Sequence, residues 1–145
     1  MVAYPVAFER DDNGTLLVTS RDLEELATFG KDNASALIQA EKAITAAVAA
    51  RIRHGRDIPM PSAPKRGEVL VALPTLLLAK MIVYMAMRTK GVSQSKLAKE
   101  MGMDARQVRR MLDPTISTHF DDLDRALRVL GKALKIEVVD RKMAA

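Results

Sequence analysis

Three polar side chains in the second half of the chain can form specific hydrogen bonds to DNA bases. They are Arg106, Gln107 and Arg110. An arginine can bind O6 and N7 of guanine with two hydrogen bonds, and a glutamine can bind adenine in the same two-point manner. Ala105 precedes them and is small enough to contact a thymine methyl group. We therefore predict that these four residues contact bases.

A second set of residues has the character of phosphate contacts. Ser93, Gln94 and Lys96 stand where a short helix is predicted to begin, and Arg109 stands among the predicted base contacts. Polar side chains and amides at a helix start commonly bind DNA phosphates. The charge distribution agrees with this interpretation, because residues 74–145 hold 14 Lys and Arg against 8 Asp and Glu, whereas residues 1–73 hold 9 against 10. A localised basic excess is typical of proteins that bind double-stranded DNA.

Two short helices must position these side chains. The segment Ser93–Leu112 has the pattern of a helix-turn-helix, with Gly102 at the turn and Asp104 as the cap of the second helix. The apolar positions at which the helices would cross are Leu97, Ala98, Met101, Val108 and either Met111 or Leu112. The same spacing also fits a plain helical hairpin with a basic side. Since one such unit reads only a few base pairs, DNA recognition would require a homodimer or a higher homo-oligomer.

Carboxylates near the N-terminus are the strongest candidates for catalysis. Glu9, Asp11, Asp12 and Asp22 form an acidic cluster, and paired carboxylates can hold Mg²⁺ for nucleic-acid hydrolysis. Asp11 and Asp12, however, fall in a predicted turn, where Asp is favoured for its backbone behaviour. A turn or an acidic partner surface is therefore preferred over catalysis. The chain also lacks a nucleophile–base set and a glycine-rich phosphate loop, so we predict no enzyme and no cofactor.

Metal binding and membrane insertion are not expected. His54 and His119 are far apart in sequence, and the chain has no Cys, so neither a disulfide framework nor a thiolate metal site is possible. Both histidines are interpreted as surface residues. No apolar run approaches the roughly 18–20 residues of a membrane helix, and the N-terminus lacks the features of a signal peptide. A cytoplasmic protein without a membrane partner is predicted.

The first half of the chain predicts a small sheet. Val2–Arg10 and Thr15–Ser20 are rich in strand-forming residues, and Asn13-Gly14 between them is a strong hairpin signal. Ala27–Gly30 is a possible third strand and Glu68–Leu73 a possible fourth. Pro5 lacks an amide proton, which predicts an edge position there.

One long helix is predicted between the third and fourth strands. Asn33 is expected to cap a helix from Ala34 to about His54, with Gly55 as its stop. The apolar stripe predicted to cover the sheet consists of Leu37, Ile38, Ile44, Val48 and Ile52. The proline-rich stretch Ile58–Pro64 that follows is predicted to be a loop.

The second half is predicted to be helical apart from its end. A helix beginning at Pro74 is expected to run to Lys90, and another from Asp121 or Asp122 to Leu130. Leu134–Val139 alternates like a strand, with Leu134, Ile136 and Val138 on one side. Because it has no sheet of its own, this strand is expected to pair with the first domain or with a second copy.

Together these features resemble a known family. The opening YPVAFERDDNGTLLVTSRDL, the helix NASALIQAEKAI, the IPMP stretch and the helix-turn-helix with its terminal strand are similar to HicB-type antitoxins of type II toxin–antitoxin pairs. Members often continue after the second strand with Pro-Asp-Leu-Pro-Gly, where this chain has Arg21-Asp22-Leu23-Glu24-Glu25. That departure leaves the toxin-binding residues unknown.

The resemblance implies an α+β fold with a partial RNase H-like β-β-β-α-β N-domain lacking nuclease activity. It implies that residues 1–73 bind a small HicA-type toxin that cleaves mRNA. It also implies that residues 74–145, an all-helical helix-turn-helix domain with a C-terminal strand, repress the operon and mediate association of copies.

Two other functions remain open at this stage. The chain could be a helix-turn-helix repressor whose N-domain senses a small ligand, which would require an apolar pocket with convergent polar groups. It could also be an active RNase H-like nuclease, which would require several carboxylates that converge on a metal.

Overall fold

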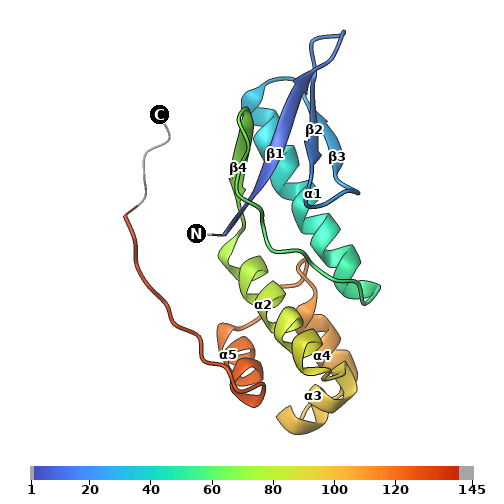
Figure 1. The fold of residues 1–145 in the computed structure, drawn as a ribbon. Helices are drawn as coiled ribbons and strands as arrows, with labels where there is room; N and C mark the ends of the chain where they lie inside the picture. The colour runs from blue at the N-terminus through green and yellow to red at the C-terminus, as the bar shows by residue number, and fades with distance from the viewer. Residues whose placement is uncertain (1, 141–145) are drawn as a thin grey trace.

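A four-stranded antiparallel sheet forms the first half of the protein, as seen in the computed structural model, which describes residues 2–140. The strands are β1 (Ala3–Arg10), β2 (Leu16–Ser20), β3 (Ala27–Gly30) and β4 (Glu68–Ala72), in the order β3-β2-β1-β4. Helix α1 (Asn33–Arg53) covers one face of this sheet (Figure 1). The predicted β-β-β-α-β order and the loop at Ile58–Pro64 are confirmed.

The second half consists of helices, which confirms the predicted α+β class. They are α2 (Thr75–Lys90), α3 (Gln94–Met101), α4 (Ala105–Leu112) and α5 (Phe120–Val129). Helix α2 leads away from the sheet, and the others gather around its far end (Figure 1). The last helix begins with His119 as its cap, slightly earlier than predicted, so Asp121 and Asp122 lie in its first turn. No helix of residues 2–140 is long and apolar enough to span a membrane.

The first hairpin forms where the Asn-Gly pair predicts it. Asn13 Oδ1 accepts hydrogen bonds from the backbone N–H and the hydroxyl of Thr15, at 3.1 and 2.7 Å. Gly14 adopts a φ of 86°, which is accessible to glycine at little cost. Pro5 lies opposite Leu70 of β4 at the end of β1 where β2 does not yet pair, so the edge position expected at this residue is confirmed, although β1 is a central strand from Val6 onward. Pro5 is tolerated because β4 joins the sheet at this end and β2 begins to pair only from Val6 onward.

The start and the buried stripe of α1 differ from prediction. Asp32 is the cap instead of Asn33, and its side chain accepts from the Ser35 amide at 2.7 Å while Ser35 Oγ accepts from the Asp32 amide. Leu37 and Ile38 are exposed, although both were assigned to the core. The small residues Ala36, Ala40 and Ala47 face the core with Ile44, Val48 and Ile52.

The close approach of helix to sheet explains that difference. At Gly30 an added Cβ would lie 2.4 Å from the Ala36 backbone nitrogen. At such a separation only small side chains fit between the start of α1 and β3. The large side chains of Leu37 and Ile38 therefore lie on the solvent-exposed side of the helix. Periodicity alone does not reveal how closely two elements approach each other.

The predicted C-terminal strand is wrong for the single chain. Leu134–Val139 pairs with no strand within residues 2–140. Ile136, Val138 and Val139 are exposed to solvent, with Val138 95% exposed, whereas Leu134 is half-buried against the core. The physical reason is that an isolated extended segment has no partner for its backbone groups and no surface on which to bury its apolar side. The residues beyond Asp140 lie outside the described part.

Candidate nucleic-acid interface

Helices α3 and α4 are the two short helices predicted within Ser93–Leu112. Ser93 caps α3 by accepting a hydrogen bond from the Lys96 amide at 3.1 Å, and Gly102 ends it with a φ of 69°. Asp104 caps α4 by accepting from the Gln107 amide at 2.8 Å. These caps satisfy backbone donors that the turn would otherwise leave free.

The expected apolar contacts hold the two helices together. All the predicted crossing residues are buried, and both candidates at the end of α4 take part: Leu97, Ala98, Met101, Val108, Met111 and Leu112. These side chains belong to the hydrophobic core that extends through α2 and α5. The segment is therefore a packed unit within the domain, and its basic side is held in one orientation.

The predicted contact residues gather on the outer surface of this unit. Arg106, Arg109, Arg110 and Lys96 are exposed, and none forms a side-chain hydrogen bond or ion pair within residues 2–140. Ser93 and Gln107 are also exposed, whereas Gln94 and Ala105 are half-buried. The four cationic side chains are thus free to meet phosphates or base edges.

Gln107 has a structural task that its sequence position did not reveal. Its Oε1 accepts a hydrogen bond from the Asp104 backbone N–H at 2.9 Å, which completes a capping box. A two-point contact with adenine needs both the oxygen and the amide nitrogen of the side chain. In this conformation the Gln107 side chain has only its NH₂ group left for a further partner.

An open pocket of about 210 Å³, lined by both polar and apolar side chains, adjoins α4. Its walls include Gln107 and Arg110 from α4, the Ser117–His119 loop and Asp122 from α5. His119, predicted to be a surface residue, is exposed there. The pocket extends the surface of the helix-turn-helix toward the start of α5.

A buried lysine that the sequence analysis did not identify supports α4 from behind. Lys80 of α2 is fully buried, and its Nζ donates hydrogen bonds to the carbonyl oxygens of Asp113 and Ile116. These carbonyls belong to the loop that leaves α4. Burial lowers the pKa of Lys80, which the nearby Asp113 carboxylate partly offsets. A lysine within an apolar stretch ordinarily predicts a surface position, so no sequence signal pointed to this role.

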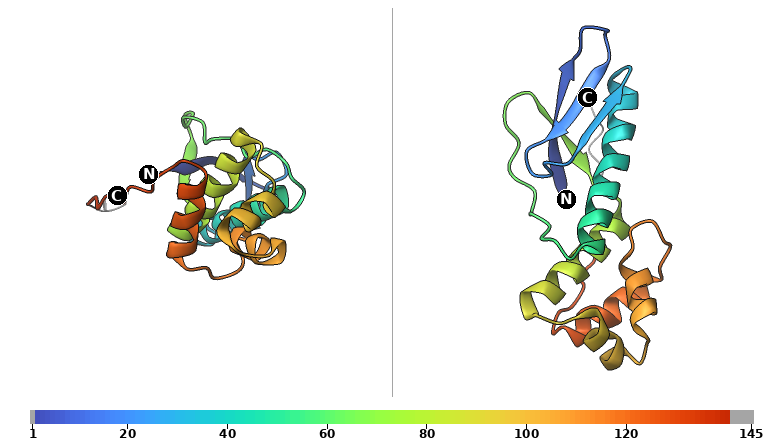
Figure 2. Two further views of the ribbon diagram at one scale, coloured as in Figure 1. Left: turned by 90° about the horizontal axis from the view of Figure 1, so that it is seen from below. Right: turned by 90° about the vertical axis from the view of Figure 1, so that its right-hand side faces the viewer.

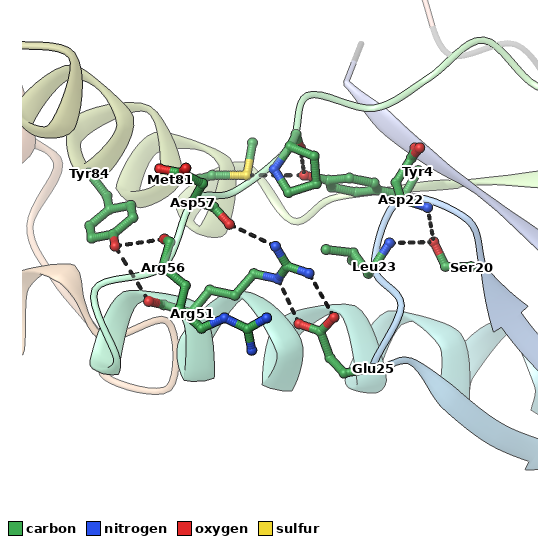
Figure 3. A network of polar contacts seen from close by, with 11 residues as sticks. Tyr4, Ser20, Asp22, Leu23, Glu25, Arg51, Arg56, Asp57, Met81 and Tyr84 are labelled. Carbon is green, nitrogen blue, oxygen red and sulfur yellow. Dashed lines mark hydrogen bonds and ion pairs between the residues drawn. The ribbon is translucent and has the colours of Figure 1, made fainter.

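Helix α2 also contacts the loop that follows α1 in the first half (Figure 3). The Tyr84 hydroxyl donates to the Arg56 carbonyl at 2.8 Å, beyond the end of α1. Arg88 forms an ion pair with Asp57 at 2.7 Å. The Tyr4 hydroxyl donates to the Pro59 carbonyl at 2.6 Å. These contacts hold the loop after α1 between the sheet and α2.

The loop after β2, where the chain departs from the pattern Pro-Asp-Leu-Pro-Gly, is well anchored. Arg21 pairs with Glu68 and Glu25 pairs with Arg51, both at 2.6 Å. The hydrogen bonds from Arg51 lower the pKa of Glu25 to about 2, and those from Arg21 lower the pKa of Glu68 to about 2. Asp22 accepts from the Ser62 amide and hydroxyl at 2.8 and 2.5 Å. These ion pairs and hydrogen bonds connect the loop to β4, to α1 and to the proline-rich loop.

The N-terminal carboxylates do not converge on one point. Asp11 Oδ1 accepts from the Asn13 amide within the turn, whereas Asp22 binds Ser62 on a different loop. Residues 2–140 contain no group of three or more His, Asp or Glu that could hold a metal ion. The geometry that a two-metal nuclease needs is not assembled in this part of the chain.

Comparison with known proteins places the chain in a family. A family model described as a HicB-like antitoxin of bacterial toxin–antitoxin systems matches residues 3–82. Antitoxin HicB 2 of Photorhabdus laumondii is 31% identical, over 94% of this chain and 96% of its own. Antitoxin HicB of Escherichia coli K12 is 25% identical, over 94% of this chain and 99% of its own. The crystal structure of the Burkholderia pseudomallei antitoxin HicB covers 70% of this chain and 94% of its own, with 19% identity and a TM-score of 0.43. The chain belongs to the HicB-like antitoxins of bacterial toxin–antitoxin systems.

Proposed function

We propose that this antitoxin neutralises a small HicA-type mRNA-cleaving toxin and represses its own operon by binding double-stranded operator DNA. Both activities would take place in the cytoplasm, where mRNA and operator are accessible. The observation that carries the DNA-binding part is the packed helix-turn-helix whose Lys96, Arg106, Arg109 and Arg110 are exposed and unpaired within residues 2–140. Such free cations on a fixed recognition helix suit the major groove.

The first half of the chain is proposed to act by binding, without enzymatic activity. Residues 1–73, up to the boundary near Pro74, would form the toxin-binding domain, and residues 74–145 the DNA-binding and dimerisation domain. The family membership supports a protein toxin as the partner. The separated carboxylates of the described residues support an interaction role over nuclease chemistry.

The C-terminal segment supports self-association. Leu134, Ile136 and Val138 alternate along an extended segment that has no partner strand in the described chain. A mostly apolar groove lies beside its start, lined by Ile82, Met85, Leu127 and neighbouring residues of α2 and α5. We propose that two copies pair through this region to present two recognition helices to DNA half-sites.

Two assays test the proposed function with the full chain. In the first, the toxin encoded beside this gene is mixed with labelled mRNA and increasing amounts of this protein. We expect cleavage to stop near equimolar protein, and continued cleavage in excess protein would contradict the antitoxin role.

In the second assay, fluorescence anisotropy compares the operon's promoter DNA with a shuffled fragment of equal length. We expect tighter binding to the promoter, whereas equal affinity would contradict repression at a specific operator. Specific DNA binding without toxin inhibition would instead favour a repressor whose N-domain serves another ligand.

A further inference from the structure

The sheet has one face that α1 does not cover. Side chains alternate along a strand, so Tyr4, Val6 and Val18 face α1 while their neighbours face the other way. Cross-strand pairing places Glu9 opposite Leu17 and Leu17 opposite Phe29. These three side chains therefore form one row across β1, β2 and β3 on the face away from α1.

The proline-rich loop covers only part of this face. Figure 2 shows the loop on the side of the sheet opposite α1. Arg21 donates to the Ala63 carbonyl at 3.0 Å, and the loop lines a shallow pocket together with Ala3 and Leu70. Pro5, opposite Leu70, is buried. The half of the face nearer the β1–β2 hairpin lies beyond these loop contacts.

Apart from Glu9 and Thr19, the side chains of the two rows on the uncovered half are apolar. Phe29 is 54% exposed, and Leu17 is half-buried beside it. The next row consists of Ala7, Thr19 and Ala27, whose short side chains leave the Phe29 ring standing above its surroundings. Exposed aromatic side chains with apolar neighbours are enriched at the centres of protein–protein contacts.

Carboxylates border this apolar area. Glu9 lies in the same row as Phe29, and Asp11 and Asp12 lie in the adjoining turn. All three are exposed, and none forms an ion pair within the described residues 2–140. Among residues 9–14 the only cation is Arg10, whose guanidinium donates to the Gly14 carbonyl. Lys31, which directly follows β3, is a second cation at this end, so the three carboxylates outnumber the cations along the edge of the surface.

We propose that this hairpin-end surface, formed by Glu9, Leu17 and Phe29 with Asp11 and Asp12, is where the toxin docks. The proposal rests on the proposed function, in which the partner cleaves RNA. A protein that binds RNA needs a basic surface to meet the phosphates. The carboxylates would pair with those basic groups while Phe29 and Leu17 fill the centre of the contact. Docking here would cover the surface with which the toxin holds RNA.

The exposed flank of α1 is the main competing surface. Ile38 is 56% exposed, nearly the same as Phe29, and Leu37 lies next to it. Charges around it are of both signs, with Glu41 and Lys42 on the following turn. A mixed surface is less complementary to a basic partner than the acidic hairpin end. Ile38 therefore provides a matched control for Phe29.

The test measures toxin binding by isothermal titration calorimetry with the full chain and three variants. Glu9→Lys and Phe29→Lys are each expected to weaken binding by about tenfold or more, which is the size of an interface hot-spot effect. Ile38→Lys is expected to change binding by less than about twofold. Melting temperature and operator affinity should stay unchanged in all three, because these side chains are exposed and far from α4.

Each other outcome overturns a stated part of the proposal. Normal toxin binding by Phe29→Lys and Glu9→Lys contradicts the hairpin-end surface, and a loss confined to Ile38→Lys assigns docking to α1 instead. If the unchanged chain does not bind the toxin, the proposed function fails and the docking surface fails with it. If Phe29→Lys or Glu9→Lys melts at a lower temperature, it is replaced by Phe29→Ser or Glu9→Gln. The replacement must also weaken toxin binding, and unchanged binding would contradict the proposal.

Discussion

Arg106 and Gln107 are adjacent on α4 but differ in what the fold leaves free. Gln107 completes the cap of its own helix through Oε1, whereas the Arg106 guanidinium has no partner within residues 2–140. Sequence patterns identified both as base contacts because both side chains have suitable chemistry. Only the hydrogen-bond geometry distinguishes a side chain that is already occupied from one that is available.

Arg106→Ala is expected to weaken operator binding by roughly 1–3 kcal/mol and to reduce discrimination between sequences. Lys96→Ala should weaken binding to all DNA sequences to a similar extent. It should also reduce the slope of log affinity against log salt concentration by about one unit. Anisotropy titrations with operator and shuffled DNA at several salt concentrations measure both effects. Unchanged operator affinity in both variants would refute the recognition-helix assignment.

The lowered pKa values of two glutamates predict how the stability of the fold changes at low pH. The folded-state pKa of Glu25 and of Glu68 is lowered to about 2 from an ordinary value of 4.5. Because the folded pKa lies below the unfolded one, the stabilisation is complete above pH 4.5 and is lost as the pH falls toward 2. We expect the urea midpoint to fall over this interval.

In the Glu25→Gln variant, the urea midpoint should fall less steeply as the pH is lowered, because one of the two carboxyl groups is gone. At neutral pH the free energy of unfolding of this variant should be lower by about 1 kcal/mol. The effect is small because the ion pair with Arg51 is partly exposed and screened by solvent. Glu24→Gln is the matched control, since Glu24 is exposed and forms no ion pair among the described residues. Identical acid curves for Glu25→Gln and the unchanged chain would contradict this assignment.

At the scale of elements, α2 joins the sheet to α4. Its Tyr84 and Arg88 hold the loop after α1, and its buried Lys80 holds the loop after α4. Every one of these contacts ends on a loop backbone or side chain distant in sequence. The elements themselves were predictable from apolar spacing and caps, but their mutual positions depend on such contacts.

Lys80→Met is expected to destabilise the fold by about 1–3 kcal/mol, because it leaves the Asp113 and Ile116 carbonyls without their donor. Lys90→Met, on the exposed end of the same helix, is the control and should change stability by less than about 0.5 kcal/mol. Urea unfolding of both variants provides the comparison. Equal stability of the two would show that the buried amine does not support the loop.

At the scale of the whole molecule, the acidic hairpin and the basic helix-turn-helix lie at opposite ends (Figure 1). The uneven distribution of charge along the sequence thus becomes a separation in space. A partner that binds the hairpin end leaves α3 and α4 accessible. We therefore expect that a toxin bound at the hairpin end would not cover the basic side chains of α3 and α4.

The exposed C-terminal segment gives a prediction for the assembled molecule. The double variant Ile136→Asp with Val138→Asp should shift the mass in solution from an oligomer to a monomer, because charges replace the proposed apolar contact. Its melting temperature at low concentration should not change, since both side chains are exposed in the single chain. Light scattering after size exclusion measures the mass.

The other side of the same segment supplies the control. Lys135→Ala with Glu137→Ala should remain an oligomer, because these side chains alternate with the apolar ones. A monomeric unchanged chain, or an oligomeric Asp variant, would refute association through this segment.

The sequence by itself determined the element order, the hairpin turn, the short helical pair α3–α4 and the family, because each depends on residues close together in the chain. Turn chemistry at Asn13-Gly14 and caps at Ser93 and Asp104 act over a few residues. Apolar spacing across Ser93–Leu112 likewise reports a local helical pair.

Only the tertiary structure decided which apolar side chains are exposed and which side chains lie together on one surface. The close approach at Gly30 moved Leu37 and Ile38 out of the core, and strand register brought Glu9, Leu17 and Phe29 into one row. Such distances and registers arise from contacts between distant segments, which local periodicity does not encode. For the same reason Leu134–Val139 has the pattern of a strand but forms none in a single chain, because a strand exists only with its partner.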